Sequence, residues 1–254
     1  VQKEDRIYSI DSHGHITEKE GAPFFDISIT KNVASMLISV LLILFLLMST
    51  ANGYKKNKYA PKKIQAFLEP LILFVRDDII KANIGPKYER YTSFLLTVFF
   101  FILINNYMGL LPGAANVTGS ISVTLVLSVF TFIITTISAN KNYWKHIFNP
   151  PTPLVLMPIM VPIEIFGVFT KPFALMVRLF ANITAGHITI LSLVSLIFIA
   201  QSASGNGFAW GVAPLSVLFV LFIYLIELLV AFLQAYIFTL LSAVFIGLAV
   251  KEDH

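Results

Sequence analysis

The chain has 254 residues, of which 57% are hydrophobic and only 13% charged, and its formal net charge is +4. This composition excludes an ordinary soluble domain and predicts a polytopic membrane protein. Cysteine is absent, which excludes disulfides, thiolate catalysis and cysteine metal sites in this chain. We interpret the small positive charge as a topology signal, so no nucleic-acid partner is expected.

Residues 1–31 are polar and mix acids with bases. This pattern predicts an exposed outer N-terminal segment that does not enter the membrane. The segment contains His13 and His15 in the sequence HGH. Two histidines in a flexible polar segment are a weak metal signal, so a solvated tail is the preferred interpretation, and neither a metal nor another cofactor is expected.

Residues 32–254 are predicted to form one all-α membrane domain of about five membrane helices, because a bilayer core needs about 20 apolar residues per crossing. The last two apolar runs are too long for a perpendicular crossing, so both are predicted to be strongly tilted helices. Between them the sequence QSASGNGFAWGVAP predicts a turn, and an earlier stretch, 140–153, predicts a short return loop. The expected helical segments are 32–51, 91–112, 120–139, 154–200 and 215–250.

Residues 62–83 place apolar side chains at spacings of three and four with charged residues between them. The pattern is typical of an amphipathic helix that lies in the membrane interface, and Pro70 predicts a kink in it. Across the surrounding stretch, 55–90, Lys and Arg outnumber Asp and Glu. The positive-inside rule then puts this stretch on the inner side, with the N-terminus outside and the C-terminus inside.

An arginine, Arg178, lies within the apolar sequence KPFALMVRLFANITAGH. A cation near the centre of a membrane helix costs roughly 2.5–3.5 kcal/mol, so it normally faces protein or water and marks an ion or substrate path. On a helix, Glu164, Lys171 and Arg178 share one side because they are seven residues apart, and Asn182 extends that side. His187 points to roughly the opposite face.

A second polar stripe joins Glu227 to Gln234 on the last apolar helix. Asn105 and Asn106 near the end of the 91–112 helix are amides that need partners in a membrane. Simpler interpretations remain open for two of the polar residues. Lys171 also fits an interfacial lysine that reaches the lipid head groups, and His187 also fits a histidine that is satisfied within a helix contact.

The segment KPFALMVRLFANITAGH, together with Glu227 in ELLVAFLQAYIFTLL and the earlier NNYMGLLPG, strongly resembles subunit a of F-type ATP synthase, the membrane stator subunit beside the rotating c-ring. The resemblance runs from the first span to the end of the chain. It implies that Arg178 faces the ring and that Asn182 and Gln234 are its polar partners. The two groups of the entrance channel fall on His187 and Glu227, in the reverse order to members that carry the acid first.

The resemblance implies a proton-translocating stator subunit with two offset half-channels and an essential arginine between them. Asn105 and Asn106 are weaker candidates for the outer half-channel, and Glu164 and Lys171 for the inner one. The expected partners are the c-ring, b-type subunits of the peripheral stalk and membrane lipid. The subunit itself would be non-catalytic. A bacterial plasma membrane is favoured over a mitochondrial inner membrane, and H⁺ over Na⁺ as the coupling ion.

Two other functions are alternatives to this interpretation. An autonomous channel or secondary transporter would conduct ions when it is reconstituted alone, but internal repeats are not apparent in this sequence, and transporter folds often show them. A purely structural membrane anchor would tolerate replacement of Arg178 with assembly and coupling intact. A membrane enzyme is disfavoured, since the sequence shows no nucleophile or metal cluster of convincing spacing.

Overall fold

The computed structural model describes residues 2–3, 6–10, 16–18, 30–56, 64–111, 116–149 and 157–250. The N-terminal segment contains three short antiparallel strands in the order β1-β2-β3. Their polar sequence did not predict them, because strands this short are defined by pairing and not by periodicity. His13 and His15 lie outside the described residues. The strands are β1 (Gln2–Lys3), β2 (Arg6–Ile10) and β3 (Ile16–Glu18).

The described part of the membrane domain is helical, which confirms the prediction of an all-α polytopic membrane protein. Four helical segments are long and apolar enough to cross a membrane, and a fifth is added if α5 and the short α6 are counted as one bent span. The main helices are α1 (Lys31–Lys56), α4 (Tyr88–Leu110), α5 (Ile121–Ile137), α6 (Lys141–Phe148) and α7 (Met157–Val250).

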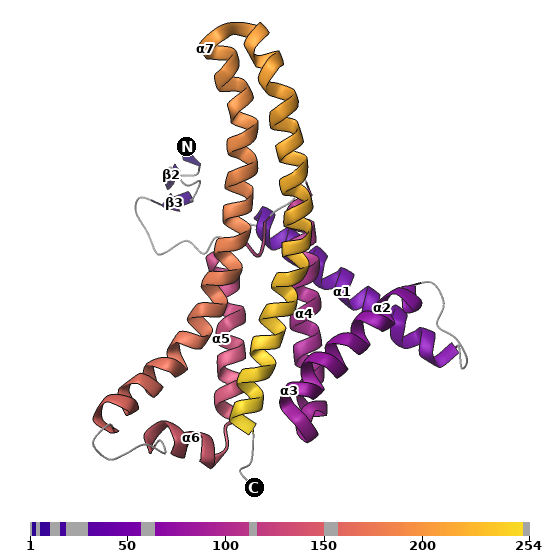
Figure 1. Ribbon diagram of the computed structural model, residues 1–254, viewed down its shortest axis with the longest axis vertical. Coiled ribbons are helices and arrows are strands. Elements are labelled where there is room, and N and C mark those ends of the chain that lie inside the picture. The colour runs from indigo at the N-terminus through magenta and orange to yellow at the C-terminus, as the bar shows by residue number, and fades with distance from the viewer. Residues whose placement is uncertain are drawn as a thin grey trace.

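Helix α7 covers 94 residues and folds back on itself at Gly205, whose φ of 78° and ψ of −179° are non-helical. The predicted turn over 201–214 is therefore too wide. Only a residue without a Cβ adopts this conformation readily, while its polar neighbours stay helical because a helix satisfies its own backbone groups. Figure 1 shows the result as a hairpin that extends beyond α4 and α5. We call Met157–Ala203 the first limb and Trp210–Val250 the second limb.

The predicted return loop over 140–153 is also corrected, because α6 occupies most of it and turns 101° away from α5. Asn140 sits at the corner between the two helices. Its backbone N–H donates to the Ala249 carbonyl at 2.9 Å, and its side-chain Nδ2 donates to the Val250 carbonyl at 2.8 Å. The last carbonyls of a helix have no partner within it, so Asn140 caps the end of α7 and ties α6 to it.

The predicted amphipathic segment is helical throughout its described part. It consists of α2 (Ile64–Leu73), a π-helical stretch (Phe74–Lys81) and α3 (Ala82–Ile84), followed by a short 3₁₀ turn (Gly85–Lys87). Pro70 lies inside α2, and the helix widens to π geometry soon after it. Val75, Ile79 and Ile80 are almost completely buried, so the apolar face of this segment packs on protein.

The hydrophobic core lies among the π-helical stretch, α4 and the end of the second limb. Leu95, Phe99 and Ile102 of α4 are fully buried, as are Ala243 and Ile246 of the second limb. The three α4 side chains follow one another at spacings of four and three, so they lie on one side of the helix. The core therefore fixes the lower half of the second limb against α4, and the upper part of the hairpin extends away from it (Figure 1).

Candidate functional site

Arg178 lies on the first limb, on a side that faces away from the core. Leu175 and Leu179 beside it are buried, whereas Phe173 and Val177 are 62% and 38% exposed. Arg178 is itself exposed. Among the residues that the structure describes, it has no ion-pair or hydrogen-bond partner. The described chain therefore offers this cation no counter-charge, although an uncompensated cation in lipid is costly.

Asn182 and Gln234 differ in their surroundings. Asn182 is exposed on the first limb, one turn beyond Arg178. Gln234 is only 4% exposed and lies in the buried side of the second limb. The structure therefore groups Asn182 with Arg178 on one outward face of the first limb, and it buries Gln234 on the second limb.

His187 and Glu227 come together across the hairpin. The Glu227 carboxylate packs directly on Gly186, where an added Cβ would overlap Oε1, and it lies within electrostatic range of His187. Oε2 of Glu227 is shielded and has no hydrogen-bond partner among the described residues. A buried polar atom of this kind calls for water or a ligand. The fold at Gly205 thus creates a polar pair from two distant parts of the sequence.

The two asparagines of α4 lie deep in the protein near this pair. Asn106 is 3% exposed, and its Nδ2 donates to the Ala231 carbonyl of the second limb at 3.0 Å. Asn105 is fully buried, and its Nδ2 donates within α4 to the Phe101 carbonyl at 2.8 Å. Oδ1 of each amide is buried without a partner in the described structure. Asn106 is therefore the one that joins α4 to the second limb.

Tyr224 is a neighbour that the sequence did not single out. Its hydroxyl donates to the Leu110 carbonyl at the end of α4, at 3.4 Å. Tyr224, Glu227 and Ala231 follow one another at spacings of three and four, so they share a face of the second limb. The signal was present as that spacing, but the side of the helix that meets α4 is known only from the fold. Tyr224 and Asn106 therefore attach α4 on either side of Glu227.

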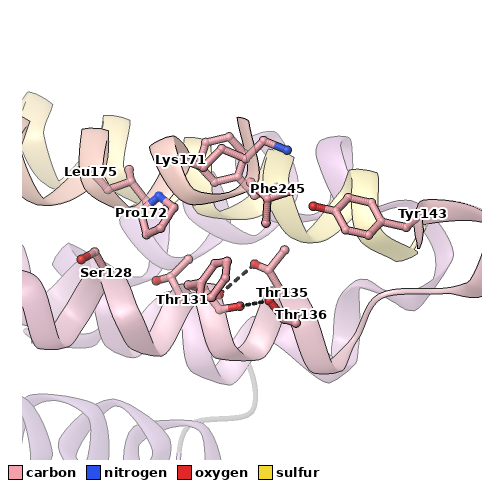
Figure 2. Close-up of a pocket in the computed structure, with 11 residues that line it drawn as sticks. Ser128, Thr131, Thr135, Thr136, Tyr143, Lys171, Pro172, Leu175 and Phe245 are labelled. Atoms are coloured by element: carbon pink, nitrogen blue, oxygen red, sulfur yellow. Dashed lines mark hydrogen bonds between the residues drawn. The ribbon is translucent and has the colours of Figure 1, made fainter. Parts of the chain in front are cut away.

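Glu164 and Lys171 lie on the first limb near its lower end, where both are partly buried and interact electrostatically. The Lys171 ammonium lies 5.8 Å from the ring centroid of Tyr143 and 5.5 Å from that of Phe245. Figure 2 shows these three side chains around one end of a pocket. Lys171 is therefore held by aromatic rings from α6 and the second limb. This contact disfavours the interpretation of Lys171 as a simple lipid-facing lysine.

Residues 33–247 match the family model described as ATP synthase A chain. The chain belongs to the ATP synthase subunit a family. It is 51% identical over 238 residues to ATP synthase subunit a of Chloroherpeton thalassium, covering 91% of this chain and 69% of that relative. It is 47% identical to the subunit a of Chlorobium phaeobacteroides, a match that covers 99% of this chain and 74% of that relative. It is 45% identical to the subunit a of Myxococcus xanthus, a match that covers 90% of this chain and 75% of that relative.

These matches confirm the family that the sequence motif predicted. Subunit a is a component of the ATP synthase complex, so the family membership implies a part in ATP synthesis and ion transport. The named relatives are bacterial, and the structure has helices able to span a membrane. Together these findings support a bacterial membrane protein.

Proposed function

We propose that this subunit a carries protons between the two membrane surfaces and the carboxylates of a rotating c-ring, through two offset half-channels separated by Arg178. One observation carries the proposal. Arg178 is an exposed cation on an apolar face and has no partner among the described residues. A neighbouring rotor that presents a carboxylate at this face would supply the missing counter-charge.

The chemistry follows from the cost of charge in lipid. A rotor carboxylate must be neutral where it faces the bilayer, because a buried unpaired charge is very unfavourable. Beside Arg178 the ionised form is favoured by the opposite charge. The same fixed charge repels protons that approach from either side, so they cannot cross directly and must travel on the rotor. Arg178 would thus couple proton flow to rotation.

The outer half-channel is proposed to run past His187 and Glu227 to the rotor face. The unpartnered Glu227 oxygen and the unpartnered amide oxygens of Asn105 and Asn106 support this path, because each has a free acceptor for water. Histidine and glutamate are suited to proton relay because their protonation can be tuned into the working pH range. Because Gly186 belongs to the first limb, the pair beside it lies close to the limb that carries Arg178.

The inner half-channel is proposed to pass Glu164 and Lys171. Asn182 is proposed to assist Arg178 at the rotor face, which its exposure on the same side supports. Gln234 is proposed to act from the buried side, as a polar residue that keeps the second limb in place behind Arg178. The N-terminus is proposed to be outside and the C-terminus inside, in a bacterial plasma membrane.

The proposed partners are the c-ring, b-type subunits of the peripheral stalk and lipid, with catalysis left to other subunits of the complex. The large apolar area that remains exposed on both limbs supports this, because a polytopic chain covers such surface only with lipid or protein. The c-ring is assigned to the face that carries Arg178.

The deciding experiment compares membrane vesicles that carry the assembled complex with wild-type subunit or with Arg178→Ala. We expect the variant to lose both ATP-driven proton uptake and ATP synthesis at an unchanged amount of assembled complex. Val177→Ala is the matched control, since it truncates an exposed neighbour without removing charge. Unchanged coupling in Arg178→Ala would refute the proposal and favour a structural anchor. Proton conduction by the isolated subunit would instead favour an autonomous channel.

A further inference from the structure

Two cavities meet at Lys171, near the lower end of the hairpin. The wider one encloses about 260 Å³ beside α6, and its walls include Asn142, His146 and Glu164. The narrower one, about 20 Å³, lies between α5 and α7. Three residues line both cavities, namely Tyr143, Val168 and Lys171. The two cavities therefore adjoin at these three residues, and we call this place the neck.

The narrow cavity is suited to water and to little else. A site needs about 10–15 Å³ of such space to hold one water molecule, so about 20 Å³ admits one. The α5 wall carries the hydroxyls of Ser128, Thr131 and Thr135, which donate to carbonyls of their own helix at 2.9, 3.2 and 2.8 Å. Each hydroxyl oxygen keeps a lone pair that can accept a hydrogen bond from water. Figure 2 shows this wall facing Lys171, Pro172 and Leu175.

The position of Lys171 in the neck depends on Tyr143. The Lys171 ammonium lies over the rings of Tyr143 and Phe245, a contact that is favourable because a ring face is negative. Phe245 belongs to the second limb, whereas Tyr143 reaches the site from α6. The Asn140 hydrogen bonds hold the start of α6 against the end of α7. The ring of Tyr143 is thus anchored independently of the first limb, which carries Lys171.

We propose that Tyr143 is a positioning residue of the inner proton path, and that its ring holds the Lys171 ammonium in the neck so that water and ions of about its size pass but larger cations and solutes do not. The proposal rests on the inner half-channel of the proposed function and deepens it. A proton crosses such a neck along hydrogen bonds to water. A larger cation is held back both by the narrow opening and by the positive charge of the ammonium.

Thiol reactivity tests this directly, because the chain contains no cysteine of its own. Thr135→Cys places a thiol in the narrow cavity of the assembled complex. Inside-out vesicles are treated with Ag⁺, which is about the size of water, or with a larger cationic methanethiosulfonate, and labelling of the subunit is measured. We expect Ag⁺ to react and the larger reagent to react slowly. Adding Tyr143→Leu should speed the larger reagent at least tenfold.

Three controls make the result specific. Tyr143→Phe keeps the ring and should leave the larger reagent slow. Trp144→Leu removes the adjacent, more exposed ring, which lines neither cavity, and should also leave it slow. Ile133→Cys places a thiol on an exposed face of α5, outside both cavities, and should show no dependence on Tyr143. If Thr135→Cys impairs assembly, Thr131→Cys reports on the same cavity.

The inference is overturned if the cavity thiol is inert to Ag⁺, since the cavity would then hold no water. It is also overturned if Tyr143→Leu leaves the larger reagent slow, or if Tyr143→Phe speeds it as much as Tyr143→Leu. These outcomes are separate from the test of Arg178. Loss of coupling in Arg178→Ala with an inert cavity thiol would leave the proposed function standing and remove only this inference. If the labelling is as expected but coupling is unchanged in Arg178→Ala, the proposed role of Arg178 is refuted and the size-selective neck remains.

Discussion

The base of the molecule, which we define as Gln65–Leu110, and the α7 hairpin are both apolar in sequence but have very different surroundings. In the most apolar stretch of Gln65–Leu110 half of the residues are buried within the chain, whereas the corresponding shares are 6% for the first limb and 11% for the second. The base is therefore stabilised by contacts within the subunit. The hairpin leaves most of its apolar side chains, and Arg178 with them, uncovered by the described chain.

The largest effect is expected on the stability of the protein, when a phenylalanine of the base and one of the hairpin are each replaced. Phe99 in the base is fully buried, and Phe222 in the second limb is 59% exposed. Phe99→Ala should lower the free energy of unfolding by about 3–5 kcal/mol, because it leaves a cavity in the core. Phe222→Ala should change it by less than about 0.5 kcal/mol. Thermal denaturation of the purified subunit in nanodiscs would compare them. Equal losses would contradict the division into a packed base and an open hairpin.

A smaller effect, on ATP-driven proton uptake, is expected when Gly186 in the hairpin is replaced. The methyl group of Ala at this position would overlap the Glu227 carboxylate, so the carboxylate must shift and its arrangement with His187 changes. ATP-driven proton uptake should fall about tenfold, equivalent to about 1.4 kcal/mol in the barrier, with assembly unchanged. Gly167→Ala is the control, since nothing lies within 4 Å of a Cβ added there. Equal uptake in both variants would show that the His187–Glu227 contact is dispensable.

The smallest effect is expected at Asn140, where the corner between α5 and α6 holds the end of the hairpin. Asn140→Ala removes the side-chain hydrogen bond to the Val250 carbonyl and keeps the backbone one to Ala249. The loss should be about 0.5–1.5 kcal/mol in the free energy of unfolding. The same nanodisc denaturation would measure it, with exposed Asn149→Ala as the control. A loss as small as that of the control would mean that this cap adds nothing to stability.

The site was predicted from the sequence only in part. Arg178 was identified from its charge in an apolar run, but its outward position, with no partner among the described residues, became visible only in the structure. His187 and Glu227 were linked by resemblance, and the fold at Gly205 is what brings them together. The sequence did not identify Tyr143 as part of the site, because nothing in the local pattern shows that α6 turns it toward Lys171.

The sequence by itself determined the class of protein, the approximate helical segments and the family, because apolar length, helical spacing and a specific motif are properties of short stretches. It misjudged the turn around Gly205 and missed α6, where helical and loop patterns are too short to distinguish. Only the tertiary structure decided which helix faces meet. Examples are the contact of Asn106 with the Ala231 carbonyl and the contact of Glu227 with Gly186. A helical repeat defines the side of a side chain on its own helix, whereas its neighbour depends on how separate helices pack.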